Sequence, residues 1–399
     1  MRILLLHNRY QYRGGEDLVF ELEQEMLVSK GNVVDALLFS NDEIRSLLSK
    51  FRTGLSLLHN SKSRRIIRRK ILEFRPDVIH IHNLFPVGSP SLLFEAKRLG
   101  VPVVMTLHNY RLICPSATLL HNGKIYERSV HSTFPIHAIR KKLYRNSYIE
   151  TAGVVWMTGI HKLLNTWNSK VATYIALTEF ARQRFIHSSL KPHPENIVVK
   201  PNFTWDPGKG STPRSDFFLY AGRLTPEKGL KLILQCAAEL PGIHFRIVGD
   251  GPMRKEVEEH AARHDNIKYD GFRDRNDVFE LLRQSRALLM PSLSFEGFPM
   301  TILEAFATGT PVISSALGSM SEIVQDCKNG LLFKAGDLSE FMARISLVSE
   351  DDALARRVSA NARKSYESLY SPEVNYEQLI SIYRVAIEKN NNRRGKNTT

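Results

Sequence analysis

Apolar runs alternate with amphipathic stretches from the first residues of the chain. Residues 3–6 are continuously apolar, and residues 77–82 and 102–109 have the same strand-like character. Residues 91–100 form an amphipathic stretch between these two strands. Residues 17–32 follow the first run and carry apolar side chains at helical spacing, at Leu18, Val19, Leu22, Met26 and Leu27. Buried strands that alternate with helices predict the α/β class, with a parallel sheet covered on both faces.

The second half of the chain repeats this alternation. Residues 217–223, 244–251 and 287–292 are strand-like, and residues 229–240 are helix-like. Between the halves lies a stretch rich in Pro, Gly, Ser and Thr, which is typical of a linker. We predict two Rossmann-like, doubly wound domains over residues 1–202 and 216–370, a linker over 203–215, a helix over 371–388 and a disordered tail over 389–399. Ligand sites in such folds lie at the carboxyl ends of the strands.

The composition is that of an ordinary soluble protein. Of the 399 residues 43% are apolar and 24% are charged, and no run approaches the roughly 20 apolar residues of a membrane-spanning helix. The first residues lack the long apolar region and cleavage site of a signal peptide. Cys114, Cys236 and Cys327 are too far apart for a disulfide framework or a metal knuckle. We therefore expect a cytoplasmic protein.

The positive charge is concentrated in one half. Residues 1–200 contain 29 Lys and Arg against 15 Asp and Glu, whereas the second half is neutral. The richest clusters, residues 62–70 and 140–145, suit nucleic acid, an anionic membrane surface or a phosphorylated acceptor, but each could equally be a solvated helix face. Nucleic acid is the remote alternative, because the chain lacks the aromatic–basic interleaving and the zinc or helix-turn-helix spacing of nucleic-acid binders.

Residues 111–170 depart from the strand–helix alternation. Asn122-Gly123 predicts a hairpin turn. The basic and aromatic stretch that follows, residues 131–170, is rich in apolar side chains for a connecting segment. It can be read as extra helices packed on the first domain, or as an amphipathic element that touches the inner face of the cell membrane or a lipid-linked substrate.

Two groups of candidate site residues follow strands of the first half. Gly14 and Gly15 come between the first strand and its helix, where a glycine allows close approach of a ligand and the helix N-terminus attracts anions. A structural turn is at least as common an explanation. His108 ends a later strand, where it could bond a substrate hydroxyl or carry a proton, although a lone histidine is more often structural.

Two further groups follow strands of the second half. Arg223 and Lys228 flank a turn with Pro226 at a helix start, which suits a phosphate: Arg can grip it bidentately and Lys acts as a point charge. Glu296 lies in a strand–helix loop, where sugar hydroxyls would be good partners for its carboxylate. Glu304 could reach ribose, but Thr301-x-x-Glu304 also matches a capping box that bonds only backbone.

Five motifs occur in a characteristic order: "RGGED", "TLHN", "GRLTPEKG", "IVGDGP", and Glu296-x7-Glu304 with an intervening Gly-Phe-Pro. On these motifs the chain resembles the retaining glycosyltransferases of family 4, in the polysaccharide-biosynthesis group, over roughly residues 1–385. The resemblance implies the GT-B architecture, in which two Rossmann-like domains face a central cleft. It also implies that the N-terminal domain binds the acceptor, the C-terminal domain binds the nucleotide-sugar, and the helix over 371–388 crosses back to the N-terminal domain.

The resemblance assigns roles to these positions. Arg223 and Lys228 would hold the donor diphosphate, Glu304 the ribose, and Glu296 the hydroxyls of the donor sugar. Catalytic roles fall to His108, Glu296, Arg223 and Lys228. Further donor contacts are expected from Gly14, Gly15, Gly249, Phe272, Gly297, Phe298, Pro299, Met300 and Thr301.

The implied activity is hexosyl transfer with retention. The donor would be a nucleotide-sugar, with UDP as the expected nucleotide, and the acceptor a glycan or polyprenyl-diphosphate-linked glycan for capsule, O-antigen (lipopolysaccharide) or exopolysaccharide. No cofactor and no obligatory metal are expected, because cations and helix N-termini can stabilise the leaving diphosphate. A nucleotide-sugar epimerase or a phosphorylase on the same fold is the alternative.

Overall fold

The computed structural model describes residues 1–9, 14–40, 61–85, 89–210 and 213–395. It divides into two compact units, each with its own sheet and core. The first unit comprises Met1–His121, Tyr126–Pro201 and Asn375–Thr399, and the second comprises Asn202–Val374 with the short piece Asn122–Ile125. The predicted α/β class with two Rossmann-like domains is confirmed.

The first unit is built on a six-stranded parallel sheet with the order β2-β1-β3-β4-β7-β8. Every residue of β3, β4 and β7, three of the four inner strands, is buried, because helices cover both faces of the sheet. The strands are β1 (Arg2–Arg9), β2 (Val33–Ser40), β3 (Val78–Ile81), β4 (Val103–Leu107), β7 (Thr173–Ala176) and β8 (Ile197–Val199).

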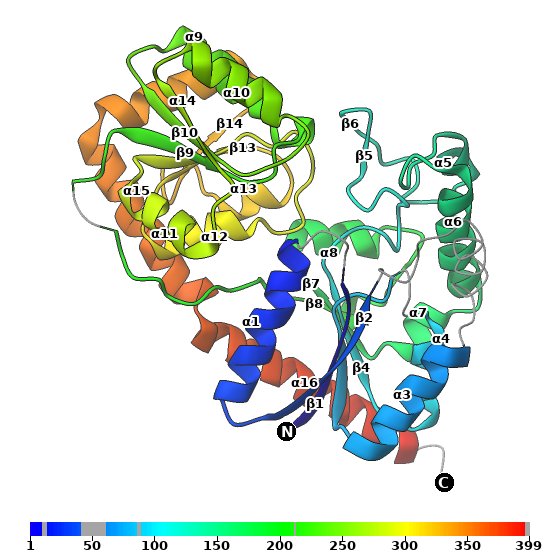
Figure 1. The fold of residues 1–399 in the computed structure, drawn as a ribbon. Coiled ribbons are helices and arrows are strands. Elements are labelled where there is room, and N and C mark those ends of the chain that lie inside the picture. The colour runs from blue at the N-terminus through cyan, green and yellow to red at the C-terminus, as the bar shows by residue number, and fades with distance from the viewer. Residues whose placement is uncertain (10–13, 41–60, 86–88, 211–212, 396–399) are drawn as a thin grey trace. The chain divides into compact units, whose positions relative to one another are not determined.

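Helices from distant parts of the chain cover this sheet (Figure 1). Helix α1 (Gly15–Ser29) and the last helix, α16 (Pro372–Gly395), lie along one face, and α3 (Ser61–Phe74) and α4 (Ser91–Arg98) lie along the other. Two shorter elements, α8 (Glu179–Ile186) and the 3-10 turn η2 (Pro194–Asn196), precede β8. The side chains of alternate residues in one strand therefore meet different helices.

The irregular segment, residues 111–170, contains a hairpin and three helices. Asn122 and Gly123 have φ values of 49° and 72°, as the hairpin turn between β5 (Leu120–His121) and β6 (Lys124–Ile125) requires. Three helices follow, α5 (Ile136–Arg140), α6 (Tyr148–Leu163) and α7 (Thr166–Lys170). Trp167 is fully buried, whereas Trp156 is 49% exposed. The reading of extra helices packed on the first domain thus agrees with the structure, whereas contact with a membrane or a lipid-linked substrate stays a prediction.

The second unit repeats the architecture, with the strand order β11-β10-β9-β12-β13-β14. Its strands, all parallel, are β9 (Phe217–Ala221), β10 (His244–Val248), β11 (Ile267–Gly271), β12 (Ala287–Met290), β13 (Val312–Ser315) and β14 (Leu331–Phe333). Its helical elements are η3 (Pro226–Lys228), α9 (Leu230–Glu239), α10 (Arg254–Arg263), α11 (Arg275–Gln284), α12 (Met300–Ala307), α13 (Ser319–Ile323), α14 (Leu338–Glu350), α15 (Asp352–Ser365) and the π-helical turn η4 (Tyr366–Tyr370).

The segment predicted as a linker, residues 203–215, packs on the second unit. Phe203 is fully buried, and the amide N–H of Gly210 donates to the carbonyl of Thr308 at 2.9 Å. The guanidinium of Arg214 donates to backbone carbonyls at the end of α11 and after α12, including that of Gly309 at 2.7 Å. The described part of this segment therefore belongs to the second unit, and the boundary falls between Pro201 and Asn202.

The prediction of a disordered tail over residues 389–399 is wrong for residues 389–395, which continue α16. Polar side chains, rather than apolar ones, attach this last part of the helix to the first unit. Lys389 Nζ donates to Asn196 Oδ1 at 2.9 Å, and Asn390 Nδ2 donates to the carbonyl of Gly100 at 2.8 Å. The polar composition predicted disorder, but hydrogen bonds to the first unit stabilise this part of the helix in place of apolar contacts. Residues 396–399 lie outside the described part.

The basic cluster over residues 62–70 is largely an ion-pair network within the first unit. Arg64 Nε lies 2.8 Å from the carboxylate of the buried Glu95, and Arg68 also faces that carboxylate. Lys70 Nζ lies 2.6 Å from Asp35. Much of this charge is therefore matched internally. Among the described helices, none combines the length and apolar character needed to cross a bilayer.

Candidate functional site

The carboxyl ends of the strands in the second unit carry most of the predicted donor residues. The strand order reverses at β9, which lies between β10 and β12, and ligands in doubly wound folds bind beside such a reversal. The loops pack closely there. Gly249 has φ +141°, and a Cβ on it would lie 1.9 Å from the carbonyl oxygen of Gly222. Gly229 has φ +75°, and its Cβ would lie 1.8 Å from the carbonyl oxygen of Pro291. Only glycine fits both positions.

Lys228 and Glu296 meet at this edge. The ammonium of Lys228, at the end of η3, donates to both carboxylate oxygens of Glu296, at 2.7 and 2.8 Å. The hydroxyl of Ser292, just beyond β12, donates to the same carboxylate at 2.8 Å. The side chains of Lys228 and Glu296 are 18% and 14% exposed, so a ligand can reach the pair. Two residues 68 positions apart in the chain thus form one polar cluster.

The electrostatics of this cluster favour the charged forms. Burial alone would raise the pKa of Glu296, but the Lys228 ammonium, the Ser292 hydroxyl and the more distant Arg223 outweigh burial and hold that pKa below its usual range. Arg223 itself is exposed, and its guanidinium forms no ion pair within the described residues. A cation directed at solvent beside a closed ion pair is an arrangement that an anionic ligand could complete.

Glu304 lies one turn into α12 and is nearly buried. Its carboxylate accepts a hydrogen bond from Arg275 Nε at 2.9 Å, and Arg275 also donates to the hydroxyl of Thr204 at 2.5 Å. The pKa of Glu304 is raised because burial outweighs the attraction of Arg275. The capping-box interpretation is wrong: α12 begins at Met300 after Pro299, so Thr301 lies inside the helix and caps nothing.

The remaining donor positions surround this edge of the second unit. Phe272 follows β11 and is 77% exposed. Gly297, Phe298, Pro299, Met300 and Thr301 form the loop into α12 and its first residues. Pro299 removes one N–H at this helix start, and the amides of the following residues remain directed along the helix axis. Their contacts with a donor stay predictions.

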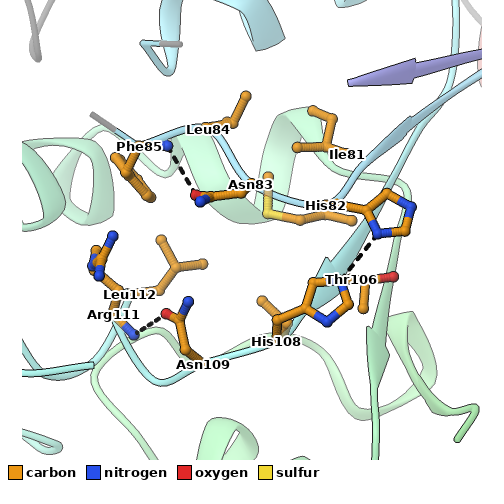
Figure 2. A pocket seen from close by; sticks show the side chains of 12 residues that line it. Ile81, His82, Asn83, Leu84, Phe85, Thr106, His108, Asn109, Arg111 and Leu112 are labelled. Carbon is orange, nitrogen blue, oxygen red and sulfur yellow. Dashed lines mark hydrogen bonds between the residues drawn. The ribbon is translucent and has the colours of Figure 1, made fainter. Parts of the chain in front are cut away.

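In the first unit, His108 lies in a hollow at the ends of β3 and β4 (Figure 2). The ring of His108 stacks on that of His82, and His82 Nδ1 lies 3.0 Å from His108 Nε2. Both rings are buried, and burial lowers the pKa of each. Asn83, Asn109 and Arg111 bring polar groups to the same hollow.

Behind His82 lies a buried ion pair. Glu23, from the middle of α1, accepts a hydrogen bond from Lys200 Nζ at 2.8 Å, and both side chains are 1% exposed. The other carboxylate oxygen of Glu23 lies 3.3 Å from His82 Nε2 and 3.5 Å from His80 Nδ1. Burial alone would raise the pKa of Glu23, but Lys200 and the two histidines hold it well below its usual range.

Glu23, His80 and His82 have the residue types and the proximity of a metal site, with ligand atoms within 4.8 Å of one another. Their hydrogen bonds argue against this role. Both ring nitrogens of His80 are already engaged, Nε2 with Thr106 Oγ1 and Nδ1 with Tyr383 Oη, each at 2.8 Å. The Lys200 ammonium already supplies the positive charge that Glu23 requires, so this donor set does not fit a cation.

Gly14 and Gly15 lie at the N-terminus of α1, as predicted. Gly14 has φ −133°, and a Cβ added to it would have nothing within 4 Å, so its backbone does not require glycine. Its amide N–H donates to Asp17 Oδ2 at 2.9 Å, and Asp17 Oδ1 lies 2.8 Å from His7 Nε2. Glu16 is bonded by Asn109 Nδ2 at 2.6 Å. Two carboxylates therefore already occupy this helix start, and its role as a diphosphate site stays a prediction.

The sequence interpretation missed several residues of these clusters. The arrangement of His80 and His82 two apart on a strand was a usable signal, because both side chains must lie on the same face of the sheet. Glu23 had a weaker signal, an acidic residue on the apolar face of a helix. No local pattern pointed to the partners Ser292, Arg275 and Lys200, which lie close only through the fold.

Two family matches together cover most of the chain. Residues 202–365 match the family described as glycosyl transferases group 1, and residues 41–202 match the glycosyl transferase 4-like domain. The boundary between the two matches coincides with the boundary between the two units.

Individual relatives have low sequence identity to this chain, and the share of the chain that they cover differs. A glycosyltransferase of Methanocaldococcus jannaschii, MJ1178, is 24% identical over 98% of this chain and 98% of its own length. The amylovoran biosynthesis glycosyltransferase AmsK of Erwinia amylovora is 27% identical over 41% of this chain and 43% of its own length. The structure of Anabaena Alr3699/HepE in complex with UDP superposes with a TM-score of 0.69 at 17% identity, covering 96% of this chain and 99% of that one.

Proposed function

We propose that this chain, which is a glycosyltransferase of the GT-B type, moves a hexose from a nucleotide-sugar to a hydroxyl of a glycan acceptor. UDP is the proposed nucleotide, and the sugar keeps its anomeric configuration. The acceptor is a glycan or polyprenyl-diphosphate-linked glycan of a surface polysaccharide. The proposal agrees with the UDP and UDP-glucose complexes of the Anabaena protein and with the amylovoran role of the Erwinia relative.

The Lys228–Glu296 pair carries this proposal. Cleavage of the bond between sugar and phosphate leaves negative charge on the diphosphate and positive charge on the sugar. The exposed Arg223 and the Lys228 ammonium can stabilise the first, and the Glu296 carboxylate can hold hydroxyls of the sugar. Because these cations lie close to where the diphosphate would leave, a divalent ion is dispensable in the proposed reaction.

Retention is proposed to follow front-face attack. The acceptor hydroxyl would approach from the side of the leaving group, and an oxygen of the departing diphosphate would take its proton. Lys228 and Arg223 then serve two purposes, since they stabilise the diphosphate and keep its oxygen close to the acceptor. Glu296 is held by Lys228 and Ser292, so its carboxylate contacts the sugar and is not required as a nucleophile.

A donor screen tests this function. The purified chain is incubated with UDP-, GDP- and ADP-hexoses, with and without EDTA, and nucleotide release is measured. We expect release from a UDP-hexose, undiminished by EDTA, and the loss of most of it in Lys228→Ala and Glu296→Ala. Lys231→Ala removes an exposed lysine of α9 and is the matched control. Full turnover by both site variants would refute the site assignment.

Product analysis separates the alternative activities on this fold. An epimerase would convert one UDP-hexose into another without releasing UDP or needing an acceptor. A phosphorylase would depend on inorganic phosphate and yield a sugar phosphate. Transfer to an added glycan acceptor, with one UDP released for each bond formed and an unchanged anomeric configuration, would establish the proposed reaction.

The surface of α6 favours an acceptor at a membrane. Ile149, Trp156 and Leu163 recur every seven residues, so they lie on one face of the helix, and they are 64%, 49% and 69% exposed. The exposed Lys141 and Arg145 precede this helix. An apolar stripe beside cations suits the headgroup region of an anionic bilayer, where a polyprenyl-linked acceptor would be found.

Vesicle co-sedimentation tests this contact. The wild-type chain should bind vesicles that contain anionic lipid and not neutral ones, and Trp156→Glu/Leu163→Glu should abolish the binding. The double variant should still release UDP from the donor in solution, because α6 is distinct from the second-unit cluster. Equal binding by wild type and variant would exclude α6 as the membrane-contacting surface.

A further inference from the structure

The buried polar cluster of the first unit ends at His108. Its members are Glu23, Lys200, His82 and His108, which come from α1, from the residue after β8, and from the ends of β3 and β4. The four side chains form a linear series of contacts: Lys200 to Glu23 at 2.8 Å, Glu23 to His82 at 3.3 Å, and His82 to His108 at 3.0 Å. Among these four residues, the two histidines are the members that line the hollow of Figure 2.

The charges of this cluster balance without the histidines. Glu23 contributes one negative charge and Lys200 one positive charge, and both side chains are 1% exposed. A protonated His82 or His108 would add a net charge to a buried site, which is costly. Burial also lowers the pKa of both rings. Both histidines are therefore neutral, and each carries one ring proton.

The position of each proton follows from Glu23. The Glu23 carboxylate oxygen lies 3.3 Å from His82 Nε2 without hydrogen-bond alignment, and its negative charge favours the proton of that ring on Nε2, because an unprotonated Nε2 would turn its lone pair toward the carboxylate. His82 Nδ1 is then an acceptor. The hydrogen bond between His82 Nδ1 and His108 Nε2 consequently requires the proton on His108 Nε2. His108 Nδ1 is left without a proton.

We infer that Glu23 and His82 are positioning residues that hold His108 in the tautomer protonated at Nε2, so that His108 Nδ1 meets the substrate as a hydrogen-bond acceptor. The group that it recognises is a hydroxyl that donates to it, as a sugar hydroxyl does. This inference rests on the proposed function for the identity of the substrate, but the tautomer is a property of the chain alone. His108 therefore orients a hydroxyl and delivers no proton to the leaving group.

The cluster is also anchored to α16. The Lys200 ammonium donates to Asn375 Oδ1 at 2.9 Å, and Asn375 Nδ2 donates to the carbonyl of Pro201 at 2.7 Å. Tyr383, two turns further along the helix, bonds His80 beside Glu23. The lysine that fixes the charge of Glu23 is thereby held from two sides, which keeps the carboxylate directed at His82.

Nuclear magnetic resonance of the full chain, labelled with ¹⁵N at histidine, reads the tautomer directly. Long-range ¹H–¹⁵N spectra distinguish a ring protonated at Nε2 from one protonated at Nδ1, and loss of signals in His108→Gln and His82→Gln assigns the two rings. We expect both rings to be protonated at Nε2 at neutral pH. A His108 ring protonated at Nδ1 would overturn the inference, whatever the enzyme proves to transfer.

Variants test the positioning. Glu23→Gln/Lys200→Met removes both charges together, so it leaves no unpaired ion, and Gln can present either a donor or an acceptor to His82. In this folded double variant, the His108 signal should shift toward a tautomer mixture and kcat/KM for the UDP-hexose should fall about 10–100-fold, as when an outer partner of a histidine is lost. Unchanged spectra and unchanged kcat/KM would contradict the inference.

Two controls separate positioning from general damage. His161→Gln replaces a buried histidine of α6 that bonds Thr166 and is outside the cluster, and it should change neither the His108 signal nor kcat/KM. His82→Gln retains an amide oxygen that can accept from His108 Nε2, whereas His82→Leu does not. Higher kcat/KM in His82→Gln than in His82→Leu is expected, and equal values would argue against the hydrogen bond.

Discussion

The two units share an architecture and differ in how they hold charge. Each has six parallel strands with one reversal of strand order, at β1 in the first sheet and at β9 in the second, and each carries a Lys–Glu pair. In the first unit the pair, Lys200 and Glu23, is 1% exposed and lies behind the residues that line a hollow. In the second unit, the side chains of Lys228 and Glu296 are 18% and 14% exposed and lie at the carboxyl ends of the strands.

This difference in exposure indicates a difference in role. A pair without access to solvent cannot exchange its partner for a ligand, so Lys200 and Glu23 can only fix the states of neighbouring groups. A pair at the surface can open when a diphosphate or a sugar competes for its members. The same two residue types thus serve as internal support in one unit and as a candidate binding site in the other.

The largest expected effect is on the stability of the first unit. Lys200→Met leaves the Glu23 carboxylate buried without a counter-ion, which should lower the free energy of unfolding by about 3–5 kcal/mol. Glu23→Gln/Lys200→Met should recover most of that loss. Urea unfolding followed by tryptophan fluorescence measures both, and a Lys200→Met variant as stable as wild type would remove the distinction between the two pairs.

The second effect is on activity and should be confined to the second unit. Lys228→Ala should lower kcat/KM for the UDP-hexose about 100- to 1,000-fold, because it removes a cation from the developing charge on the diphosphate. Its effect on unfolding should stay near or below about 1 kcal/mol, since the pair is partly solvated. Steady-state kinetics and urea unfolding of the same preparation check both halves of this prediction.

Glycine substitutions should also change the stability of the two units to different extents. Gly249→Ala meets the carbonyl of Gly222 at 1.9 Å and imposes φ +141° on alanine, so it should cost about 1–3 kcal/mol. Gly14→Ala has φ −133° and open space around its Cβ, so it should leave stability unchanged. Thermal unfolding of the two variants compares them, and a destabilised Gly14→Ala would show that this helix start is more constrained than its geometry indicates.

The remaining predictions concern pH. Burial lowers the pKa of His80, His82 and His108 below the unfolded value of about 6.5, so the unfolded chain binds protons first as the pH falls. The first unit should therefore lose stability below about pH 6.5, with a slope of about 1.4 kcal/mol per pH unit for each such proton.

The ion pair of the second unit should respond at lower pH. The pKa of Glu296 lies below its usual range, so its contribution is complete above the unfolded value of about 4.3 and is lost as the pH falls through the lower folded value. Hydrogen exchange between about pH 7 and pH 5 should show faster opening of the first unit before the second. Loss of protection in both units at the same pH would contradict this order.

The sequence was sufficient for the fold and for one of the two clusters. The alternation of strands and helices predicted both sheets, because parallel strands buried on both faces are continuously apolar. Lys228 and Glu296 were both predicted as site residues, but as holders of different parts of a donor, and their direct bond was not foreseen. Strand-end positions are predictable from topology, whereas a contact across 68 residues is not.

The first cluster was recovered only in part. His108 is predictable from its place after a strand, but Glu23 is not, because a single glutamate in an amphipathic helix is usually solvent-facing. Its partner Lys200 is 177 positions away. The helical end of α16 was missed for a related reason: residues 389–395 have few apolar side chains, and their hydrogen bonds to the first unit leave no trace in composition.

Tethering of Lys200 to Asn375 has a consequence for biosynthesis. The first unit is discontinuous in the chain, and its charged centre is complete only when residues 375 onward are available. A ribosome makes those residues only after the entire second unit. Until α16 has been made, residues 1–201 therefore lack the helix that covers part of their apolar and charged interior. The second unit, in contrast, can fold as a nearly continuous segment. Nascent chains that stop before α16 should accordingly be substrates for chaperones and proteases, and the second unit should be the first to resist digestion.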